Sequence, residues 1–249
     1  MTERFPLRLT YRRQLTASVC HYAFLRDDGQ PLAFHPGQFI QIHFHHSDGH
    51  QTKRSYSLAN RRDSAADADA AAEIVVSQIP GGAGTAFLDG LNIGDRIMAS
   101  GAHGTFHLYP DGHHRRHLMI ATGTGISAFR AMSPQLGHRM AQDDIEAVLL
   151  FGVRTPLDLL FADEFYEFSE RFPRFRFVPC FSREMPQHPR PDDRQGHVQA
   201  HLAAFEPNPQ TDSAYLCGNP QMVDACTSLL KSAGLRMAQI RREKFIPNS

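Results

Sequence analysis

Hydrophobic and polar residues follow a short-range alternation in the first hundred residues of the chain. Short apolar runs are separated by Gly, Pro, Asp and Asn, which is typical of β-strands joined by turns. In one run, Ile40, Ile42 and Phe44 fall on one face and polar residues on the other, as a half-buried strand of a barrel requires. The predicted strands are Leu15–Leu25, Gln38–His46, Ile74–Ile79 and Arg96–Ser100. The Ala- and Asp-rich stretch Arg61–Ala72 is predicted to be a solvated loop.

After Pro110 the pattern changes to apolar strands that alternate with helical periods. Such alternation predicts βαβ units and a parallel sheet. The predicted strands are His117–Ala121, Ala147–Gly152, Phe175–Phe181 and Ala214–Cys217, and the predicted helices include Phe161–Phe172, Val198–Phe205 and Pro220–Ala233. Pro, Asp, Gly and His residues make Tyr109–Arg115 a linker. We therefore predict two domains, an antiparallel β-barrel over residues 1–112 and an α/β parallel-sheet, Rossmann-like domain over residues 113–249.

Net charge narrows the class of partner. The chain has 249 residues, with 26 basic and 26 acidic side chains, and this balance argues against nucleic-acid binding. Only Lys53, Lys231 and Lys244 are lysine, so 23 of the basic residues are arginine. Arginine binds phosphate and carboxylate in a bidentate manner, which fits an anion-binding protein, although for the count alone a codon bias of the genome is the better explanation.

The cysteines and the N-terminus bear on location and metal content. Cys20, Cys180, Cys217 and Cys226 form no CxxC pair, so we expect no metal centre, no iron–sulfur cluster and a reduced, cytoplasmic setting. Several histidines lie between residues 43 and 50, but no acidic ligand set accompanies them. No apolar run has membrane-spanning length, and the N-terminus lacks the pattern of a signal peptide.

Three segments carry candidate chemistry. Ile120–Ala128 places two glycines between a strand and a helix, where free backbone N–H groups favour a phosphate; a simple tight turn is the alternative. Arg54–Leu58 combines a guanidinium, an aromatic ring and hydroxyls, which suits a planar phosphorylated cofactor or a plain strand edge. Gly81–Thr85 could cradle a second phosphate or form a flexible hairpin.

Taken together, the motifs resemble those of the ferredoxin–NADP reductase family over nearly the whole chain. The barrel half matches in Arg54-Ser-Tyr-Ser, the glycine turn ending at Thr85, Leu91-x-x-Gly-Asp95 and Gly101-x-x-Gly-Thr-Phe106. The second half matches in Gly123-Thr-Gly-Ile, Phe151-Gly-x-Arg154, Ser182-Arg-Glu184, Cys217-Gly-Asn-Pro220 and Glu243-Lys-Phe245. The resemblance implies FAD bound by the barrel and NADP bound by the α/β domain.

The resemblance also implies roles for individual residues. Tyr56 would stack on the isoalloxazine, Ser57 would hydrogen-bond near its N5 atom, and Arg54 would hold the pyrophosphate. Cys217 would line the nicotinamide site, flanked by Glu243 and Phe245. The expected catalytic residues are Ser57, Cys217, Glu243 and Phe245. The expected cofactor-binding residues are Arg54, Ser55, Tyr56, Ser57, Leu58, Gly81, Gly82, Gly84 and Thr85 in the barrel, and Thr122, Gly123, Thr124, Gly125, Arg154, Ser182, Arg183, His197, Cys217, Gly218 and Phe245 in the α/β domain.

The set of arginines favours NADP over NAD. Arg154 and Arg183 match positions that bind the 2′-phosphate in bacterial relatives, and no acidic residue stands where an NAD enzyme would bind the ribose hydroxyls. His197 occupies the third position, where it would bind phosphate only when protonated. Arg194 is an alternative source of that charge.

We therefore expect a cytoplasmic, monomeric ferredoxin– or flavodoxin–NADP reductase that moves electrons between NADPH and an acidic electron-transfer protein through FAD. Arg61–Arg62 and Arg241–Arg242 could form a local positive rim for that acceptor. The alternatives are the reductase component of an oxygenase, a free-flavin reductase, and an FAD-carrying subunit without turnover of its own. Nucleic-acid and membrane partners are not expected.

Overall fold

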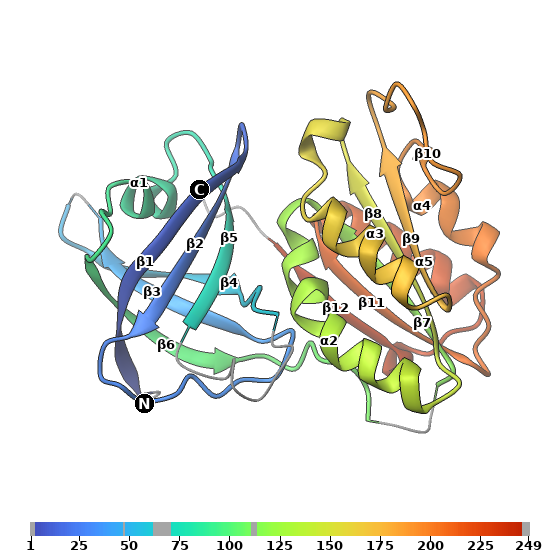
Figure 1. Ribbon diagram of the computed structural model, residues 1–249, viewed down its shortest axis with the longest axis horizontal. Helices are drawn as coiled ribbons and strands as arrows, with labels where there is room; N and C mark the ends of the chain where they lie inside the picture. The colour runs from blue at the N-terminus through green and yellow to red at the C-terminus, as the bar shows by residue number, and fades with distance from the viewer. Residues whose placement is uncertain (1–2, 47, 62–70, 111–113, 246–249) are drawn as a thin grey trace. The chain divides into compact units, whose positions relative to one another are not determined.

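The computed structural model describes residues 3–46, 48–61, 71–110 and 114–245. The chain divides into two compact units. Among the described residues, the first comprises those up to His107 together with Ser127–Pro134, and the second comprises those of Leu108–Ile126 and residues 135–245. Each unit is built on its own six-stranded sheet (Figure 1).

The first unit is an antiparallel sheet rolled into a barrel. Its strands are β1 (Arg4–Thr16), β2 (Val19–Arg26), β3 (Phe39–His45), β4 (Gln51–Ser57), β5 (Ala71–Ser77) and β6 (Arg96–His103). Their order is β4-β3-β6-β1-β2-β5, and a bridge between Leu58 and Ile74 links the two outer strands. The predicted antiparallel barrel is confirmed.

Alternation along β3 follows the sequence prediction. Ile40 and Ile42 are fully buried and Phe44 nearly so, while the residues between them are partly exposed. The prediction of one strand over Leu15–Leu25 is wrong, because the chain turns at Ala17–Ser18 and continues as the antiparallel partner of β1.

The second unit is a parallel sheet with helices on both faces. Its strands are β7 (Arg116–Thr122), β8 (Glu146–Val153), β9 (Phe175–Phe181), β10 (Arg194–Gln195), β11 (Asp212–Gly218) and β12 (Ile240–Lys244). Their order is β10-β9-β8-β7-β11-β12, so the direction of strand addition reverses between β7 and β11. The predicted parallel α/β domain is confirmed.

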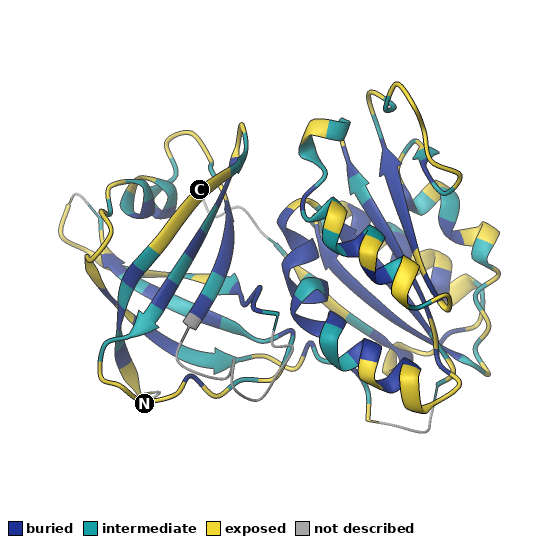
Figure 2. Ribbon diagram, in the orientation of Figure 1, coloured by how far each residue is buried: buried dark blue, intermediate teal, exposed yellow. Residues whose placement is uncertain are grey.

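The helices cover this sheet and one end of the barrel. They are α1 (Ala83–Asp89), α2 (Ile126–Gln142), α3 (Ala162–Arg171), α4 (Val198–His201) and α5 (Pro220–Ser232). The helices α4 and α5 pack on one face of the sheet through Val198, Val223 and Leu230. On the other face, Phe165 of α3 stacks on Phe177 with ring centroids 5.2 Å apart. Figure 2 shows that the four central strands of the second unit, β7, β8, β9 and β11, are mostly buried, while α3 keeps an exposed outer side.

Two further observations concern the chain as a whole. All four cysteines are free and buried. Among the described residues, no helix is long and apolar enough to cross a membrane.

Most of the predicted loop Arg61–Ala72 lies outside the described residues, but Ala71 and Ala72 already belong to β5.

Candidate functional site

In the barrel, the Arg54–Leu58 segment places its residues on two faces of β4. Arg54 and Tyr56 are register partners of the buried Ile42 and Ile40, so their side chains lie on the core side of the sheet. Ser55 lies on the opposite face, where its hydroxyl accepts a hydrogen bond from Gln41 at 3.4 Å. The predicted set is therefore divided between two faces.

Helix α1 approaches this core-side face through a glycine. A Cβ atom on Gly84 would lie 2.8 Å from the Tyr56 hydroxyl and 3.2 Å from Arg54 Cγ. No other residue allows the backbone of α1 to lie so close to these two side chains. Gly84, Arg54 and Tyr56 are thus brought together from segments about thirty residues apart in the sequence.

The hydrogen bonds around this cluster leave donors for a ligand. Arg54 Nη1 donates to Thr52 Oγ1 at 3.1 Å and to the Lys53 carbonyl at 3.0 Å, and no carboxylate in the described part of the chain pairs with the guanidinium. Thr85 Oγ1 accepts from the Ile79 amide at 3.0 Å, so its own O–H remains a donor. The amides of Ala83, Gly84 and Thr85 in the first turn of α1 have no partner within the helix, whereas the Gly82 amide donates to the Ile79 carbonyl at 2.9 Å. This donor set, beside one arginine, fits a pyrophosphate.

Burial separates the remaining barrel residues. Burial raises the pKa of the Tyr56 phenol to about 12, which keeps the ring neutral. Ser57 is 6% exposed, and Leu58 is fully buried in the core with its amide donating to the Gln38 carbonyl at 2.9 Å. The side chain of Leu58 therefore packs in the barrel and does not face solvent.

In the second unit, the strand ends β7 and β11 meet where the strand order reverses. A Cβ atom on Gly125 would lie 2.3 Å from the Cys217 carbonyl oxygen, and one on Gly218 would lie 2.4 Å from Thr122 Oγ1. Thr122 Oγ1 accepts from the Asn219 amide at 2.9 Å, which ties the two strand ends together. In open parallel sheets, ligands bind at this switch point, outside the carboxyl ends of the strands.

The predicted nicotinamide residues lie at the same edge. Cys217 and Glu243 are register partners on β11 and β12, and the Phe245 amide donates to the Gly218 carbonyl at 2.8 Å. Cys217 is fully buried, and burial, reinforced by the nearby Glu243 carboxylate, raises the pKa of its thiol well above the usual value. Burial thus favours the neutral thiol, which lacks the reactivity of a thiolate nucleophile.

The predicted phosphate-binding residues follow the ends of the next strands. The amide of Arg183, after β9, donates to the carbonyl of Arg154, after β8, at 2.9 Å. Both side chains are exposed, and neither guanidinium pairs with a carboxylate within residues 3–46, 48–61, 71–110 and 114–245. Ser182 donates its hydroxyl to the Val153 carbonyl at 3.2 Å. These two arginines leave their guanidinium donors available for an anion.

The third phosphate position contains an exposed histidine. His197 precedes α4 at the end of β10 and is exposed. Arg194, the alternative, donates to the carbonyls of Pro191 and Asp193 at 2.7 and 2.9 Å and lies 3.6 Å from Asp192. Its guanidinium is thus already engaged, which leaves His197 as the residue with a free side chain at this point of the edge.

Sequence reasoning missed one residue that builds the site. Asn219 accepts hydrogen bonds from the amides of Gln221 and Met222 at 2.8 and 3.3 Å, and so caps α5 directly after Gly218. The sequence contains a signal for this cap: Asn219 followed by Pro220 is a typical start of a helix, and it could have identified Asn219. The histidines between residues 43 and 50 do not lie in a cluster of metal ligands. Among the described residues, no three His, Cys, Asp or Glu side chains are placed to hold an ion.

Comparison with known proteins likewise divides the chain into an FAD-binding part and an NAD-binding part. Residues 6–108 match the sequence model of an oxidoreductase FAD-binding domain, and residues 119–228 match that of an oxidoreductase NAD-binding domain. The chain is 31% identical over 253 residues to a ferredoxin–NADP reductase B from Sorangium cellulosum, and the match covers 98% of each chain. The chain belongs to the ferredoxin–NADP reductase family.

Other members of the ferredoxin–NADP reductase family are longer. An aromatic O-demethylase reductase subunit from Amycolatopsis is 35% identical, and the match covers 95% of this chain and 71% of that protein. A propane 2-monooxygenase reductase component from Rhodococcus jostii is 32% identical, and the chain spans 62% of its length. The crystal structure of a cytochrome P450 reductase from Amycolatopsis superposes with a TM-score of 0.83 at 31% identity, covering all of this chain and 72% of that one. As a ferredoxin–NADP reductase family member, the chain is an oxidoreductase with an FAD-binding and an NAD-binding domain.

Proposed function

We propose that this chain takes a hydride from NADPH onto FAD and delivers the electrons singly to a separate redox protein, a ferredoxin or a flavodoxin. The observation that carries the proposal is the order of side chains along one edge of the parallel sheet. From β10 to β12, the strand ends bear His197, Arg183, Arg154, the Gly123–Gly125 turn, Cys217 with Gly218, and Glu243 with Phe245. This order matches the parts of a dinucleotide laid across the switch point.

The edge separates the two ends of the nucleotide. Adjacent strands lie about 4.8 Å apart, so the arginines after β8 and β9 stand one to two strand spacings from the glycine turn. The turn would hold the pyrophosphate with its amides, and Arg154 and Arg183 would hold a 2′-phosphate on the adenosine side. The small, neutral Cys217 would then line the nicotinamide on the other side. These positions support NADPH as the donor.

The barrel residues would hold the flavin. Arg54 and the amides of Gly84 and Thr85 would bind the pyrophosphate, with the Thr85 hydroxyl as a further donor, and the neutral Tyr56 ring would pack against the isoalloxazine. Ser57 would donate its hydroxyl near N5. FAD, when bound, accepts a hydride and gives up its electrons singly, which a nicotinamide cannot do. The protein aligns the reactants and excludes water.

The one-electron acceptor must come from outside these 249 residues, because the four cysteines are buried on separate elements and hold no cluster. A second candidate is the reductase of an oxygenase system. The reductases from Amycolatopsis and Rhodococcus jostii, at 35% and 32% identity, favour it.

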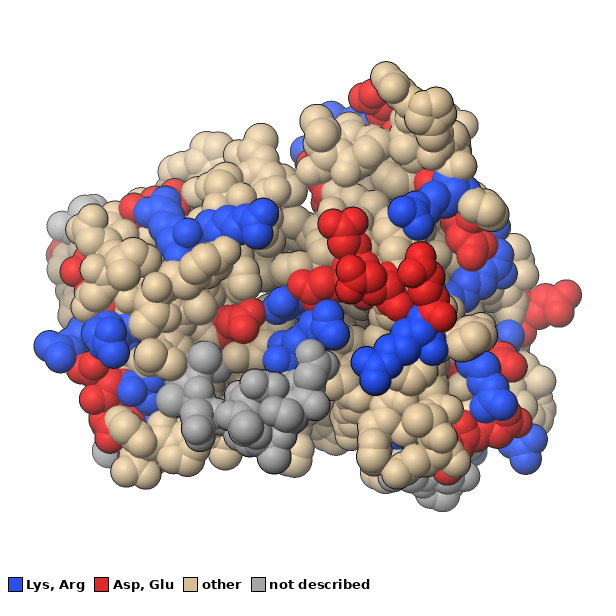
Figure 3. Space-filling view, in the orientation of Figure 1, with Lys and Arg blue, Asp and Glu red and all other residues tan. Residues whose placement is uncertain are grey.

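Charge is unevenly spread over the surface of the protein: Figure 3 shows acidic side chains gathered over α3, whose first turn carries Asp163 and Glu164.

The experiment is a ranking of acceptors. The purified chain, reconstituted with FAD, is supplied with NADPH and with ferricyanide, a ferredoxin, a flavodoxin or free FMN in turn. We expect reduction of ferricyanide and a higher kcat/KM for one protein acceptor than for FMN. A preference for FMN would instead identify a free-flavin reductase. Absence of turnover with ferricyanide would contradict the proposal and favour a subunit that acts only inside a complex.

A further inference from the structure

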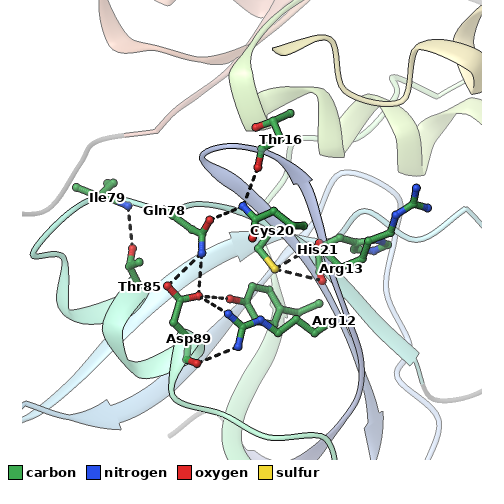
Figure 4. Close-up of polar contacts among 11 residues, drawn as sticks. Arg12, Arg13, Thr16, Cys20, His21, Gln78, Ile79, Thr85 and Asp89 are labelled. Atoms are coloured by element: carbon green, nitrogen blue, oxygen red, sulfur yellow. Dashed lines mark hydrogen bonds and ion pairs between the residues drawn. The ribbon is translucent and has the colours of Figure 1, made fainter. Parts of the chain in front are cut away.

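The segment Gln78–Asp89 carries the predicted pyrophosphate residues, and its two ends are joined by one carboxylate. We call Gln78–Asp89 the cradle segment. Gln78 Nε2 donates to both Asp89 carboxylate oxygens at 3.0 and 3.1 Å (Figure 4). Between these ends, the Ile79 amide donates to Thr85 Oγ1 at 3.0 Å. The cradle segment is therefore closed on itself by hydrogen bonds, and the Asp89 carboxylate is the acceptor that joins its two ends.

The same carboxylate ties the cradle segment to the barrel wall. The Tyr22 hydroxyl, on β2, donates to Asp89 Oδ1 at 2.7 Å. Arg12, on β1, donates to Asp89 Oδ1 at 3.1 Å and to the Asp89 carbonyl at 2.9 Å. Tyr22 is fully buried, and burial together with Asp89 raises the pKa of its hydroxyl, so this donor keeps its proton. Asp89 thus joins β1, β2 and the cradle segment (Figure 4).

Helix α1 needs these contacts because it is short. It has seven residues, of which Gly84 and Leu88 are buried, and so short a helix is not stable on its own. Besides Asp89, it is held by Leu88, which is fully buried in the barrel core, and by Phe87, which stacks on Phe44 with ring centroids 4.8 Å apart. At its other end, Gly84 lies against Tyr56 and Arg54 with no room for a methyl group. A small displacement of α1 therefore changes the spacing between its amides and Arg54.

We propose that Asp89 is a positioning residue for FAD: it fixes α1 from the far end, so that the Ala83–Thr85 amides and Arg54 bind one pyrophosphate together. Asp89 does not touch the ligand. The inference rests on the proposed function, since it takes the cradle segment to hold the FAD pyrophosphate. Removing the carboxylate leaves the donors of Tyr22 and Gln78 without their acceptor and leaves Arg12 with only the Asp89 carbonyl, which loosens the C-terminal end of α1.

The test measures FAD affinity directly, without catalysis. Apoprotein is titrated with FAD, and the dissociation constant is obtained from quenching of flavin fluorescence. Asp89→Ala should raise the dissociation constant at least about tenfold. Asp89→Asn keeps one oxygen for Tyr22 and Gln78, so its dissociation constant should lie between those of the wild type and Asp89→Ala.

The matched control is Asp27→Ala. Like Asp89, Asp27 is a carboxylate of the barrel that pairs with arginine, in its case with Arg8 at 3.0 Å and with Arg96. In the described part of the chain, Asp27 forms no hydrogen bond or ion pair with the cradle segment. Its loss should lower the melting temperature of the apoprotein and leave the FAD dissociation constant within about twofold of the wild type.

The outcomes separate the two claims. A wild-type apoprotein that binds no FAD overturns the proposed function and this inference together. Wild-type binding with an unchanged dissociation constant in Asp89→Ala overturns the inference and leaves the function standing. If Asp89→Ala does not fold, Asp89→Asn decides: wild-type FAD affinity combined with a lowered melting temperature would show that the carboxylate only stabilises the fold.

Discussion

Cys217 and Glu243 are register partners at the carboxyl ends of the adjacent parallel strands β11 and β12. The thiol is fully buried, and the carboxylate is close enough to help raise its pKa. The small neutral side chain of Cys217 and the acidic side chain of Glu243 thus lie together at the carboxyl edge of the sheet, next to the point between β7 and β11 where the strand order reverses. This pair defines the part of the edge where we place the nicotinamide.

Glu243→Gln should slow hydride transfer by at least about tenfold while leaving the dissociation constants of FAD and NADPH nearly unchanged. The amide keeps the size of the side chain and removes its charge beside the reacting ring. Stopped-flow measurement of flavin reduction separates the rate from binding. The control is Asp224→Asn, which breaks the exposed ion pair with Lys244 (2.7 Å) on the other side of β12. Equal rates in the wild type and Glu243→Gln would remove Glu243 from the mechanism.

Arg154→Ala and Arg183→Ala should each raise the KM for NADPH about tenfold and leave the KM for NADH unchanged, because only NADPH carries the 2′-phosphate. Steady-state kinetics with both nucleotides checks this. Arg176→Ala is the matched control, since its guanidinium is already paired with Asp192. A parallel rise in both KM values would mean that the arginines support the fold of the edge and do not select NADP.

His197 is expected to add to binding of the 2′-phosphate, because its side chain is exposed just after β10, one strand beyond Arg183. His197→Ala should therefore raise the KM for NADPH and leave the KM for NADH unchanged, which steady-state kinetics with both nucleotides measures. An unchanged KM for NADPH in His197→Ala would exclude the histidine from phosphate binding.

Much of the fold and of the candidate site could be predicted from the sequence, because burial imposes a pattern. In β3 the alternation is clear, and in the parallel sheet the central strands contain apolar runs that are buried on both faces, as Ala214–Cys217 of β11 is. The strand ends of such a sheet must share one edge, so the grouping of Gly123, Cys217 and Arg154 at that edge follows from the topology.

Elements whose residues are mainly polar or glycine could not be predicted this way. β12 reads Ile-Arg-Arg-Glu-Lys and pairs only with β11, at the sheet edge, so little of it needs to be apolar. Helix α1 follows two glycines, and the sequence predicts only a phosphate-binding turn or a flexible hairpin over Gly81–Thr85, since glycine lowers helix propensity. Its stability comes from Leu88, Phe87 and Asp89, whose partners lie on distant strands.

The stability of the second unit should depend on pH through His117. The imidazole is 2% exposed, its Nδ1 lies 2.7 Å from Ser213 Oγ, and burial, with the nearby Arg139, lowers its pKa to about 4. The unfolded chain therefore binds a proton first as the pH falls. Stability is complete above about pH 6.5 and decreases toward pH 4, by up to about 3 kcal/mol.

Urea unfolding of the wild type and His117→Asn across this pH range checks the prediction. The difference in their free energies of unfolding should shrink as the pH falls, because the variant has no imidazole to protonate. The exposed His138→Asn is the control and should keep the wild-type pH dependence. A constant difference between the wild type and His117→Asn would show that the buried imidazole is not the group that titrates.

The most direct test of the central claim is anaerobic mixing of the FAD-loaded chain with NADPH, followed by the visible absorbance of the oxidised flavin. The account predicts rapid bleaching by NADPH and slower bleaching by an equal concentration of NADH, with the difference lost in the Arg154→Ala/Arg183→Ala double variant. Flavin that stays oxidised with NADPH would contradict it.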